Sequence, residues 1–508
     1  MEDLRRALKD GKERLEWFMN TELAIFIIYL IITVSIGVFF FFRSRESGSE
    51  KEYFLGGRKM GPWVSALSAG ASDMSAWVLM GLPGSIYFYG IGQTWIAIGL
   101  ALGYTLSWIF EAPRLRRYSI AAKDSITIPQ YLTNRFLSSS KAMQAICAVI
   151  FLVAYTIYAA SSISACGTLF EKVVGIDSHV AMYLAAIVIV AYTFMGGFSA
   201  VCWTDFFQGM LMLGALLIAP IFALALINAG DSASAMSQVG GGYWTLFTNW
   251  KDVASGLGWG LGYFGMPHII IRFMSVRSDK DIKKSATIGI SWTVLILGFS
   301  VAAGIIARMM GERIVVGSAS EAETVFIQMV RLIFPAAISG VLLSAILAAS
   351  MSTADSQLLA SASAFASDVY KPILRKGKAE DAEMFWIGRL VVLIIALAAL
   401  LIATDPNCGT IMGLVGNAWG VFGAAFGPVI LLSLFWKRLT FKGAVAGIVC
   451  GAAVDILWLA FLGDFGLYEI IPGFVCGLLG ALVVSLLDRQ PKPEVTAMFD
   501  RVASGQER

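Results

Sequence analysis

The sequence predicts an all-α polytopic membrane protein with about thirteen transmembrane helices. Hydrophobic residues make up 57% of the 508 positions and charged residues only 14%, whereas soluble proteins carry about 25% charged residues. The apolar residues form runs of roughly 20, the length at which a helix crosses a bilayer. Short polar stretches separate these runs, so we exclude a soluble two-domain protein.

From hydropathy we expect a leader at 1–21, a first helix and cytoplasmic loop at 22–60, further spans up to 487 and a tail at 488–508. The expected spans lie at 22–42, 61–84, 91–110, 142–166, 179–196, 205–228, 253–274, 285–308, 335–365, 384–404, 409–435, 441–462 and 466–487. A short amphipathic helix is expected at 321–333.

Lysine and arginine gather in alternate loops. One set of loops carries most of them, whereas the opposite loops hold few, among them Lys172, Lys251 and Arg313. Because cytoplasmic loops are enriched in these residues, we expect a cytoplasmic C-terminus and an N-terminus outside. The charged leader runs against this rule. The net charge of +3 gives no reason to expect nucleic acid, and the six cysteines show neither metal-type spacing nor a disulfide framework.

The second span contains a carboxylate at membrane depth. Asp73 there is accompanied by small and hydroxyl residues, namely Ser68, Gly70, Ser72 and Ser75. A charged side chain at the bilayer centre costs about 2.5–3.5 kcal/mol on insertion scales, so it normally faces a cavity, a partner charge or an ion. Opened backbone is tolerated in a membrane only where it lines a cavity. We therefore expect half of a cation and solute site here.

The seventh span, 253–274, is the second interrupted one. It carries alternating glycines at 256, 258, 260 and 262, followed by Pro267. A regular helix is costly there, because each glycine costs about 1 kcal/mol and a proline about 3 relative to alanine. The two interrupted spans are five apart. This spacing favours an inverted five-plus-five repeat with paired broken helices around a midplane site.

The ninth span is rich in hydroxyl groups. Within 343–358 stand Ser350, Ser352, Thr353 and Ser356, together with Asp355. Hard cations such as sodium prefer oxygen ligands, and hydroxyls combined with free carbonyls supply them. The alternative is that these side chains bond to the carbonyl one turn back and only bend the helix.

Three motifs then carry a resemblance: GASDMSAWVLMGLPG from Gly70, GLGYFGMPHIIIRFM from Gly260 and LSAILAASMSTADSQLL from Leu343. They resemble the sodium/solute symporters, over about 25–490. The resemblance implies uptake of a small solute, L-proline first, with Na⁺ as the coupling ion, by alternating access in the cytoplasmic membrane of a bacterium. It implies a transporter and no enzyme.

The resemblance also implies a ten-helix transport core at 61–435 with two peripheral helices at 436–487, and it implies site residues. Sodium would be bound by the carbonyls of Ala71, Met74 and Ala349 and the hydroxyls of Ser352 and Thr353, with Asp73 beside the ion. The solute would lie among Ser75, Trp77, Tyr158, Trp259, Tyr263 and Pro267. A possible second cation site would include Asp205, Asp355 and Ser356. Arg58 would act in gating or coupling; otherwise it is a charge that marks a cytoplasmic loop.

Several alternatives stay open. Asp205 is equally explained as a helix N-cap, and single aromatic residues are commonly packing residues. The solute is alternatively a betaine, pantothenate or another amino acid, and the coupling ion is alternatively a proton. A membrane-embedded enzyme would use Asp73, Asp205 and Asp355 as acids. Met266 and Ala76 stand where the resemblance leads us to expect glutamine and glycine, so both bear on solute selectivity.

Overall fold

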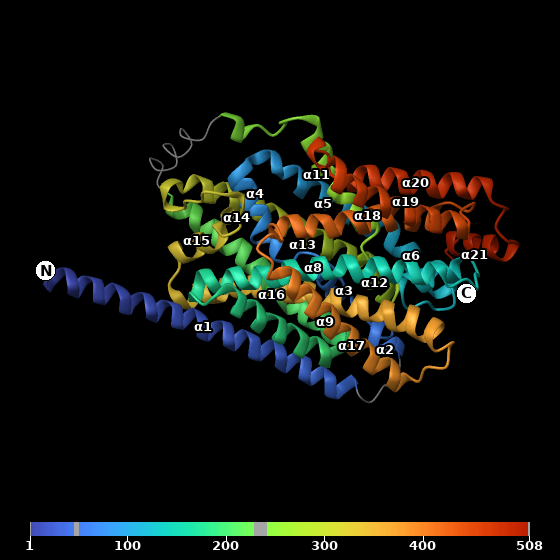
Figure 1. Cartoon of the computed structure of the whole chain (residues 1–508), viewed down its shortest axis with the longest axis horizontal. Coiled ribbons are helices and arrows are strands. Elements are labelled where there is room, and N and C mark those ends of the chain that lie inside the picture. Colours follow the sequence, from blue (N-terminus) through green and yellow to red (C-terminus); the bar gives the residue numbers. More distant parts are fainter. Residues whose placement is uncertain (1, 45–49, 228–240, 506–508) are drawn as a thin grey trace.

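A computed structural model describes residues 2–44, 50–227 and 241–505 (Figure 1). Within these ranges the protein is helical, and one isolated β-bridge joins Met60 to Val276. The expected boundaries at Met1, residue 228 and residues 506–508 lie outside the described part, as do loop residues 45–49. The predicted all-α fold class is confirmed.

Ten helices in the described ranges are long and apolar enough to cross a membrane. They lie in α1 (Glu2–Ser44), α5 with α6 (Thr94–Leu106 and Ala112–Ala121), α8 (Ala142–Val174), α9 (Ser178–Leu226), α13 (Asp279–Met309), α16 (Ala336–Ser363), α17 (Asp381–Ala403), α18 (Ile411–Phe435), α19 (Phe441–Leu462) and α20 (Ile470–Leu487). The expected spans at 61–84 and 253–274 consist of shorter pieces, and the span at 179–196 is the first part of α9, where the apolar stretch Ser178–Ala191 is too short to count. The number thirteen therefore stays a prediction.

The second expected span is interrupted around Asp73. α3 (Pro62–Ala71) begins with a proline in its first turn, where no amide hydrogen is needed. α4 (Gly81–Tyr89) resumes the crossing. Between them the amide of Asp73 bonds to the carbonyl of Gly70 at 3.2 Å. The regular pattern thus ends, which leaves the Ala71 carbonyl to accept a hydrogen bond from another helix.

The seventh expected span is interrupted in the same way. It consists of α11 (Trp250–Gly258), the 3₁₀ helix η6 (Trp259–Phe264) and α12 (Pro267–Ser275). Its glycines also serve packing, since a Cβ added at Gly260 would lie 2.3 Å from the carbonyl oxygen of Gly99 on α5. Small residues allow such close backbone approach. The two broken helices occur where the sequence predicts them.

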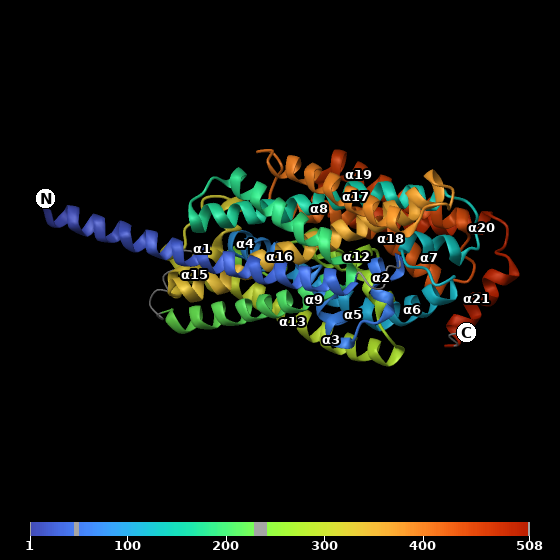
Figure 2. The ribbon, with the colours of Figure 1, turned by 90° about the horizontal axis from the view of Figure 1, so that it is seen from below.

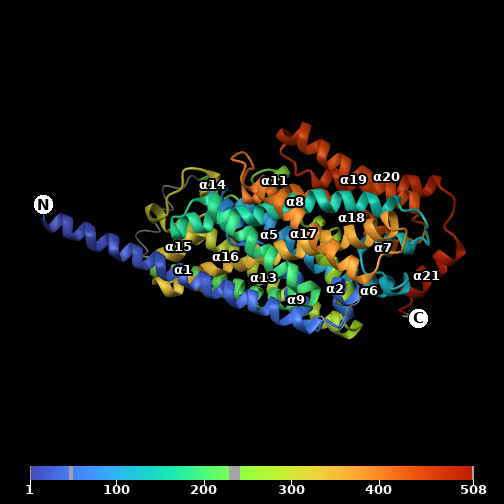
Figure 3. The ribbon, with the colours of Figure 1, turned by 60° about the horizontal axis from the view of Figure 1, so that its bottom comes forward.

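α16 lies at the centre of the bundle. Of its most apolar window 83% is buried inside the protein, against 28% for α19 and 28% for α20. α1 and the α19–α20 pair lie on opposite flanks (Figures 1 and 3). α1 packs on α9 and α16, and Figure 2 shows α1 running across these two helices. The central helix is therefore the one with the hydroxyl groups.

Three elements differ from the expectation. The leader is no separate segment, because its Glu, Lys, Arg, Leu and Ala residues are good helix formers and continue into α1. The fifth and sixth spans form one helix, α9, which is kinked at Gly197 with φ +62°. The third span extends beyond 110, through the π-helical turn η4 (Ser107–Glu111) into α6.

The remaining elements are short. They are α2 (Glu50–Leu55), η1 (Gly56–Arg58), η2 (Ala76–Val78), η3 (Ile91–Gln93), α7 (Ile128–Arg135), η5 (Gly241–Trp244), η7 (Gly311–Arg313), α14 (Ala319–Ala322), α15 (Val325–Ile333), η8 (Ala364–Leu374), η9 (Gly463–Phe465) and α21 (Pro493–Ala503). α14 and α15 take the place of the amphipathic helix expected at 321–333. α21 lies in the expected tail and packs on α6.

Candidate functional site

The residues expected to bind sodium on α3 and α16 lie together. The Ser352 hydroxyl donates to the Ala71 carbonyl oxygen at 2.8 Å and lies 3.1 Å from the Ala349 carbonyl oxygen. The adjacent Thr353 hydroxyl is buried and has no hydrogen-bond partner in the described part. Met74 is also fully buried. This group of oxygen atoms matches the preference of a hard monovalent cation.

Asp73 lies in the interruption beside this group. It is fully buried, and one carboxylate oxygen accepts a hydrogen bond from the Tyr263 hydroxyl. The other carboxylate oxygen has no partner in the described residues. The main-chain carbonyl accepts from Trp77 Nε1 and from the Tyr158 hydroxyl, each at 3.1 Å. A buried carboxylate without a cationic partner is unfavourable, so a bound cation would stabilise it.

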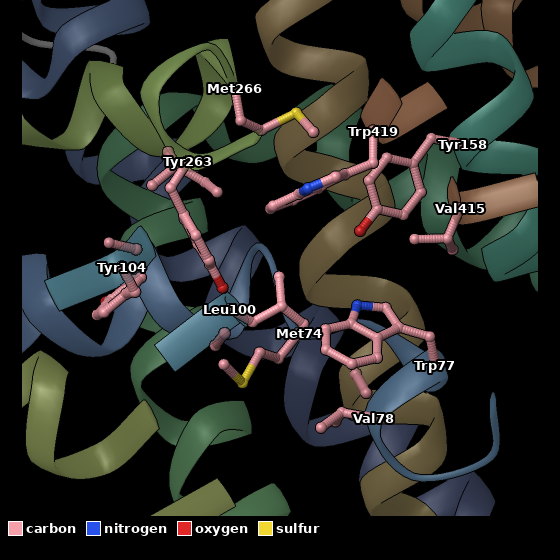
Figure 4. Close-up of a cluster of buried hydrophobic side chains, with 14 of the residues drawn as sticks. Met74, Trp77, Val78, Leu100, Tyr104, Tyr158, Tyr263, Met266, Val415 and Trp419 are labelled. Carbon is pink, nitrogen blue, oxygen red and sulfur yellow. The ribbon is translucent and has the colours of Figure 1, made fainter. Parts of the chain in front are cut away.

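Aromatic side chains gather around Asp73, because Trp77, Tyr158 and Tyr263 all bond to it, and Figure 4 shows these three in one buried cluster. The rings of Tyr263 and Trp419 meet edge to face with centroids 5.1 Å apart. Figure 4 shows Trp419 between Tyr263 and Tyr158, with Met266 nearby. Sequence reasoning did not single out Trp419, since an aromatic residue in an apolar helix is usually a packing residue. Its position in the glycine-rich stretch GNAWGVFG was the available signal.

Of the other expected solute residues, Ser75 lies at Asp73, since its amide donates to the Asp73 carbonyl oxygen at 2.9 Å. Ser75 precedes η2, where its hydroxyl accepts the amide of Trp77 at 3.5 Å. The Trp259 ring stacks on Tyr468 with centroids 5.0 Å apart. Pro267 is the first residue of α12 and is buried. The structure thus groups Trp77, Tyr158 and Tyr263 at Asp73, whereas Trp259 lies toward a neighbouring cavity.

The residues of the possible second cation site surround an arginine. Arg272 Nη2 lies 2.8 Å from Asp205 Oδ2 and 2.6 Å from Ser356 Oγ. Its Nε donates to Ser68 Oγ at 2.6 Å, and Ser68 donates to Asp205 at 2.6 Å. Ser356 also donates to Asp355 at 3.1 Å. A guanidinium group of the protein itself therefore neutralises Asp205.

Sequence reasoning missed Arg272. An arginine near the end of an apolar span looks like the start of a positively charged loop. The structure instead buries it, with 2% of its surface exposed, on α12 opposite Asp205. The signal was its place in IIIRFM, one turn before the span ends.

Arg58 connects three segments at the end of the bundle that carries the basic loops. Its Nε lies 2.9 Å from Asp124 Oδ1, Nη2 donates to the Ser125 carbonyl at 2.8 Å, and Nη1 donates to the Met274 carbonyl. Burial alone would raise the pKa of Asp124, but hydrogen bonds from Lys51 and Arg58 hold that pKa below its usual value. Arg58 is thus more than a loop charge.

Comparisons with known proteins place this geometry in a family. A model of the sodium:solute symporter family matches residues 53–451. The chain is 44% identical to the high-affinity proline transporter PutP of Bacillus subtilis (strain 168), with 91% of this chain and 97% of that protein aligned. It is 43% identical to the sodium/proline symporter of Escherichia coli (strain K12), over 94% and 95% of the two chains.

Solved structures share the fold. A Na⁺-coupled sialic acid symporter in its substrate-bound outward-open state has a TM-score of 0.78 at 21% identity, with 93% of this chain and 99% of that chain covered. The nucleobase-cation-symport-1 transporter MHP1 has a TM-score of 0.55 at 14% identity, with 89% and 98% covered.

Proposed function

The chain belongs to the sodium:solute symporter family, and we propose that it takes up L-proline together with sodium. The observation that carries this proposal is the oxygen group between α3 and α16, beside a buried Asp73 that has no cationic partner among the described residues. The relatives at 43–44% identity are proline transporters. Transport, and no catalysis, is the activity that this family performs.

Sodium couples to proline through the interrupted second span. An ion bound by Ala71, Met74, Ala349, Ser352 and Thr353 joins α3 to α16 and neutralises Asp73. The Asp73 backbone and side chain in turn hold Trp77, Tyr158 and Tyr263. Aromatic faces suit the proline ring and attract its ammonium group, and amides freed in a broken helix suit its carboxylate.

One sodium ion is enough to drive uptake. Proline is a neutral zwitterion, so one ion moves one net charge. Across 100 mV this is about 2.3 kcal/mol, or about a fifty-fold accumulation. Arg272 supplies the positive charge at Asp205, which favours a single transported sodium over two.

The basic loops give the orientation. We place the end of the bundle with Arg58 and the C-terminus in the cytoplasm; the two termini lie at opposite ends of the long axis (Figure 1). α3 to α18 form the transporting core, with α1, α19 and α20 peripheral. Arg58 acts as a cytoplasmic gate that releases when the loaded core opens inward. A protease site added at the C-terminus should be cut only after cells are permeabilised.

Proline uptake into proteoliposomes tests the proposal. We expect uptake with sodium outside and almost none when choline replaces it. Equal uptake in choline would indicate proton coupling and contradict the proposal. Excess unlabelled proline should abolish the signal. Inhibition by a betaine or pantothenate instead would indicate another solute, for which Met266 beside Trp419 would be the first residue to examine.

A further inference from the structure

Two buried carboxyl groups lie outside the site described above. Asp455 on α19 is fully buried, and Glu469, directly before α20, is 8% exposed. Both face Gly420 on α18: a Cβ added there would lie 2.9 Å from Asp455 Oδ1 and 3.3 Å from Glu469 Cγ. Glycine at 420 thus leaves room for both side chains.

Nothing in the described part neutralises this pair. Both carboxylate oxygens of Asp455 are buried and lack a hydrogen-bond partner there, and no described lysine or arginine lies within 4 Å of either carboxyl group. The Lys251 ammonium group, which lies at this end, bonds to the Phe465 carbonyl at 2.6 Å. The other ionisable groups that share a cavity lining with Glu469 are Tyr468, Asp252 and Glu323.

Glu469 lines two cavities, of about 320 and 330 Å³, which we call the vestibule, whereas Asp455 lies beside Gly420 and lines neither of them. Both cavities are lined by Gln93, Ile96, Trp259, Tyr468 and Glu469. Their walls include the carboxylates Asp252, Glu323 and Glu469 but no lysine or arginine. A cleft lined by one sign of charge raises the local concentration of counter-ions.

The acids that line the vestibule, and Asp455 next to Glu469, differ in the hydrogen bonds that they already accept. Glu323 accepts the amides of Ile411 and Met412 at 3.1 and 3.0 Å, and so caps α18. Asp252 accepts from Thr248 and Asn249. Asp455 has no such partner. The excess negative charge is therefore located at Asp455 and Glu469.

Contacts lead from the pair to Asp73. Tyr468, next to Glu469, stacks on Trp259. The carbonyl of Trp259 accepts from Trp419 Nε1 at 2.8 Å, and Trp419 meets Tyr263, which bonds to Asp73. The vestibule is thus separated from the sodium and proline site by a few aromatic side chains.

We propose that Asp455 and Glu469 bind one sodium ion between them at the wall of the vestibule, from which ions are supplied to the Asp73 site. Asn417 and Tyr468 line the same cavity and offer further oxygen atoms. A proton shared between the two acids would engage one oxygen of Asp455 and leave the other without a partner. A cation bound by both oxygens satisfies the group fully, and sodium accepts oxygen ligands. The inference rests on the proposed sodium coupling.

Uptake kinetics give the first test. Asp455→Asn and Glu469→Gln should each raise the sodium concentration for half-maximal proline uptake about five- to tenfold, because the local supply of ions falls. Asp464→Asn removes an exposed acid at the same end and should change it less than twofold. Unchanged sodium dependence in both variants would overturn the inference while leaving the proposed function intact. Wild-type uptake without sodium dependence would overturn both.

Sodium binding without transport gives the second test. In purified Asp73→Asn protein, NaCl should still raise the unfolding temperature above its value in choline chloride. That rise should disappear when Asp455→Asn or Glu469→Gln is added. Its persistence in both combinations would contradict the inference. If the two variants instead shift only the pH profile of uptake, the pair holds a shared proton and the sodium assignment is wrong.

Discussion

Asp73 and Asp205 are both fully buried acids near the interrupted second span, yet their surroundings are opposite. Asp205 pairs with Arg272 at 2.8 Å and accepts from Ser68 of α3. Each acid keeps one carboxylate oxygen without a hydrogen-bond partner in the described part, but the Asp73 carboxylate bonds only to a tyrosine and has no cationic partner there. Asp205 has its cation built into the chain, whereas we propose that Asp73 takes its cation from solution.

This difference separates structure from transport. A permanent ion pair fixes α12 against α9 and α3, because removing one partner leaves a buried charge. A site that takes its cation from solution can instead exist in two states, loaded and empty, and a ligand shifts an equilibrium only through its different affinity for the two states. The following changes are ordered from the largest expected effect to the smallest.

Arg272→Gln should destabilise the protein by about 3–5 kcal/mol, since Asp205 is left buried and unpaired. Unfolding of the purified protein in detergent measures this loss. The double variant Arg272→Gln/Asp205→Asn should regain most of it. Equal stability of single and double variants would show that the pair has no such structural role.

Asp73→Asn should affect sodium dependence rather than stability, in contrast to Arg272→Gln. In sodium-free buffer its stability should equal or exceed that of the wild type, because no protein cation is lost. The sodium concentration for half-maximal uptake should rise at least about tenfold, equivalent to about 1.4 kcal/mol. Uptake with wild-type sodium affinity would refute the role of Asp73 in sodium binding. Strong destabilisation would show that Asp73, like Asp205, has a structural role.

Thr353→Ala tests the hydroxyl without a partner on α16. Removing one cation ligand should raise the sodium requirement about fivefold, a cost of about 1 kcal/mol, and change the proline requirement less. Ser350→Ala is the matched control, because the Ser350 hydroxyl bonds to the Ile346 carbonyl one turn back at 2.9 Å. A larger effect on proline than on sodium would count against the ligand assignment.

Trp419→Phe removes the 2.8 Å hydrogen bond to the Trp259 carbonyl. Losing about 0.5–1.5 kcal/mol should raise the KM for proline two- to tenfold and leave the sodium requirement within twofold. Trp95→Phe serves as the control. It loses a comparable hydrogen bond, from Trp95 Nε1 to the Leu246 carbonyl at 3.0 Å, which lies away from the site. A shift in sodium dependence alone would place Trp419 outside the solute pocket.

The sequence predicted the elements whose signals are local. Glycine, serine and proline residues mark the two interruptions because they disfavour a regular helix, and hydroxyl groups in α16 mark the proposed cation ligands. The contact of Ser352 with Ala71 joins segments 281 positions apart, so it came from the family resemblance. The position of α16 at the centre agrees with its hydroxyls but is not encoded in its apolar pattern.

Other features depend on partners that lie far away in the chain. Arg272 cannot be recognised as buried until Asp205 and Ser68 are seen around it. Asp455 appears as one acid inside an apolar span until Gly420 and Glu469 are placed beside it. The continuity of α1 was missed for a different reason, namely that charge was weighed above helix propensity.

Proline affinity with and without sodium tests the central claim most directly. The claim is that an ion between α3 and α16 shapes the proline pocket at Asp73. We expect sodium to raise proline affinity at least about tenfold in the purified wild-type protein and to have no effect in the Ser352→Ala/Thr353→Ala variant. A full sodium effect in that variant would contradict the account.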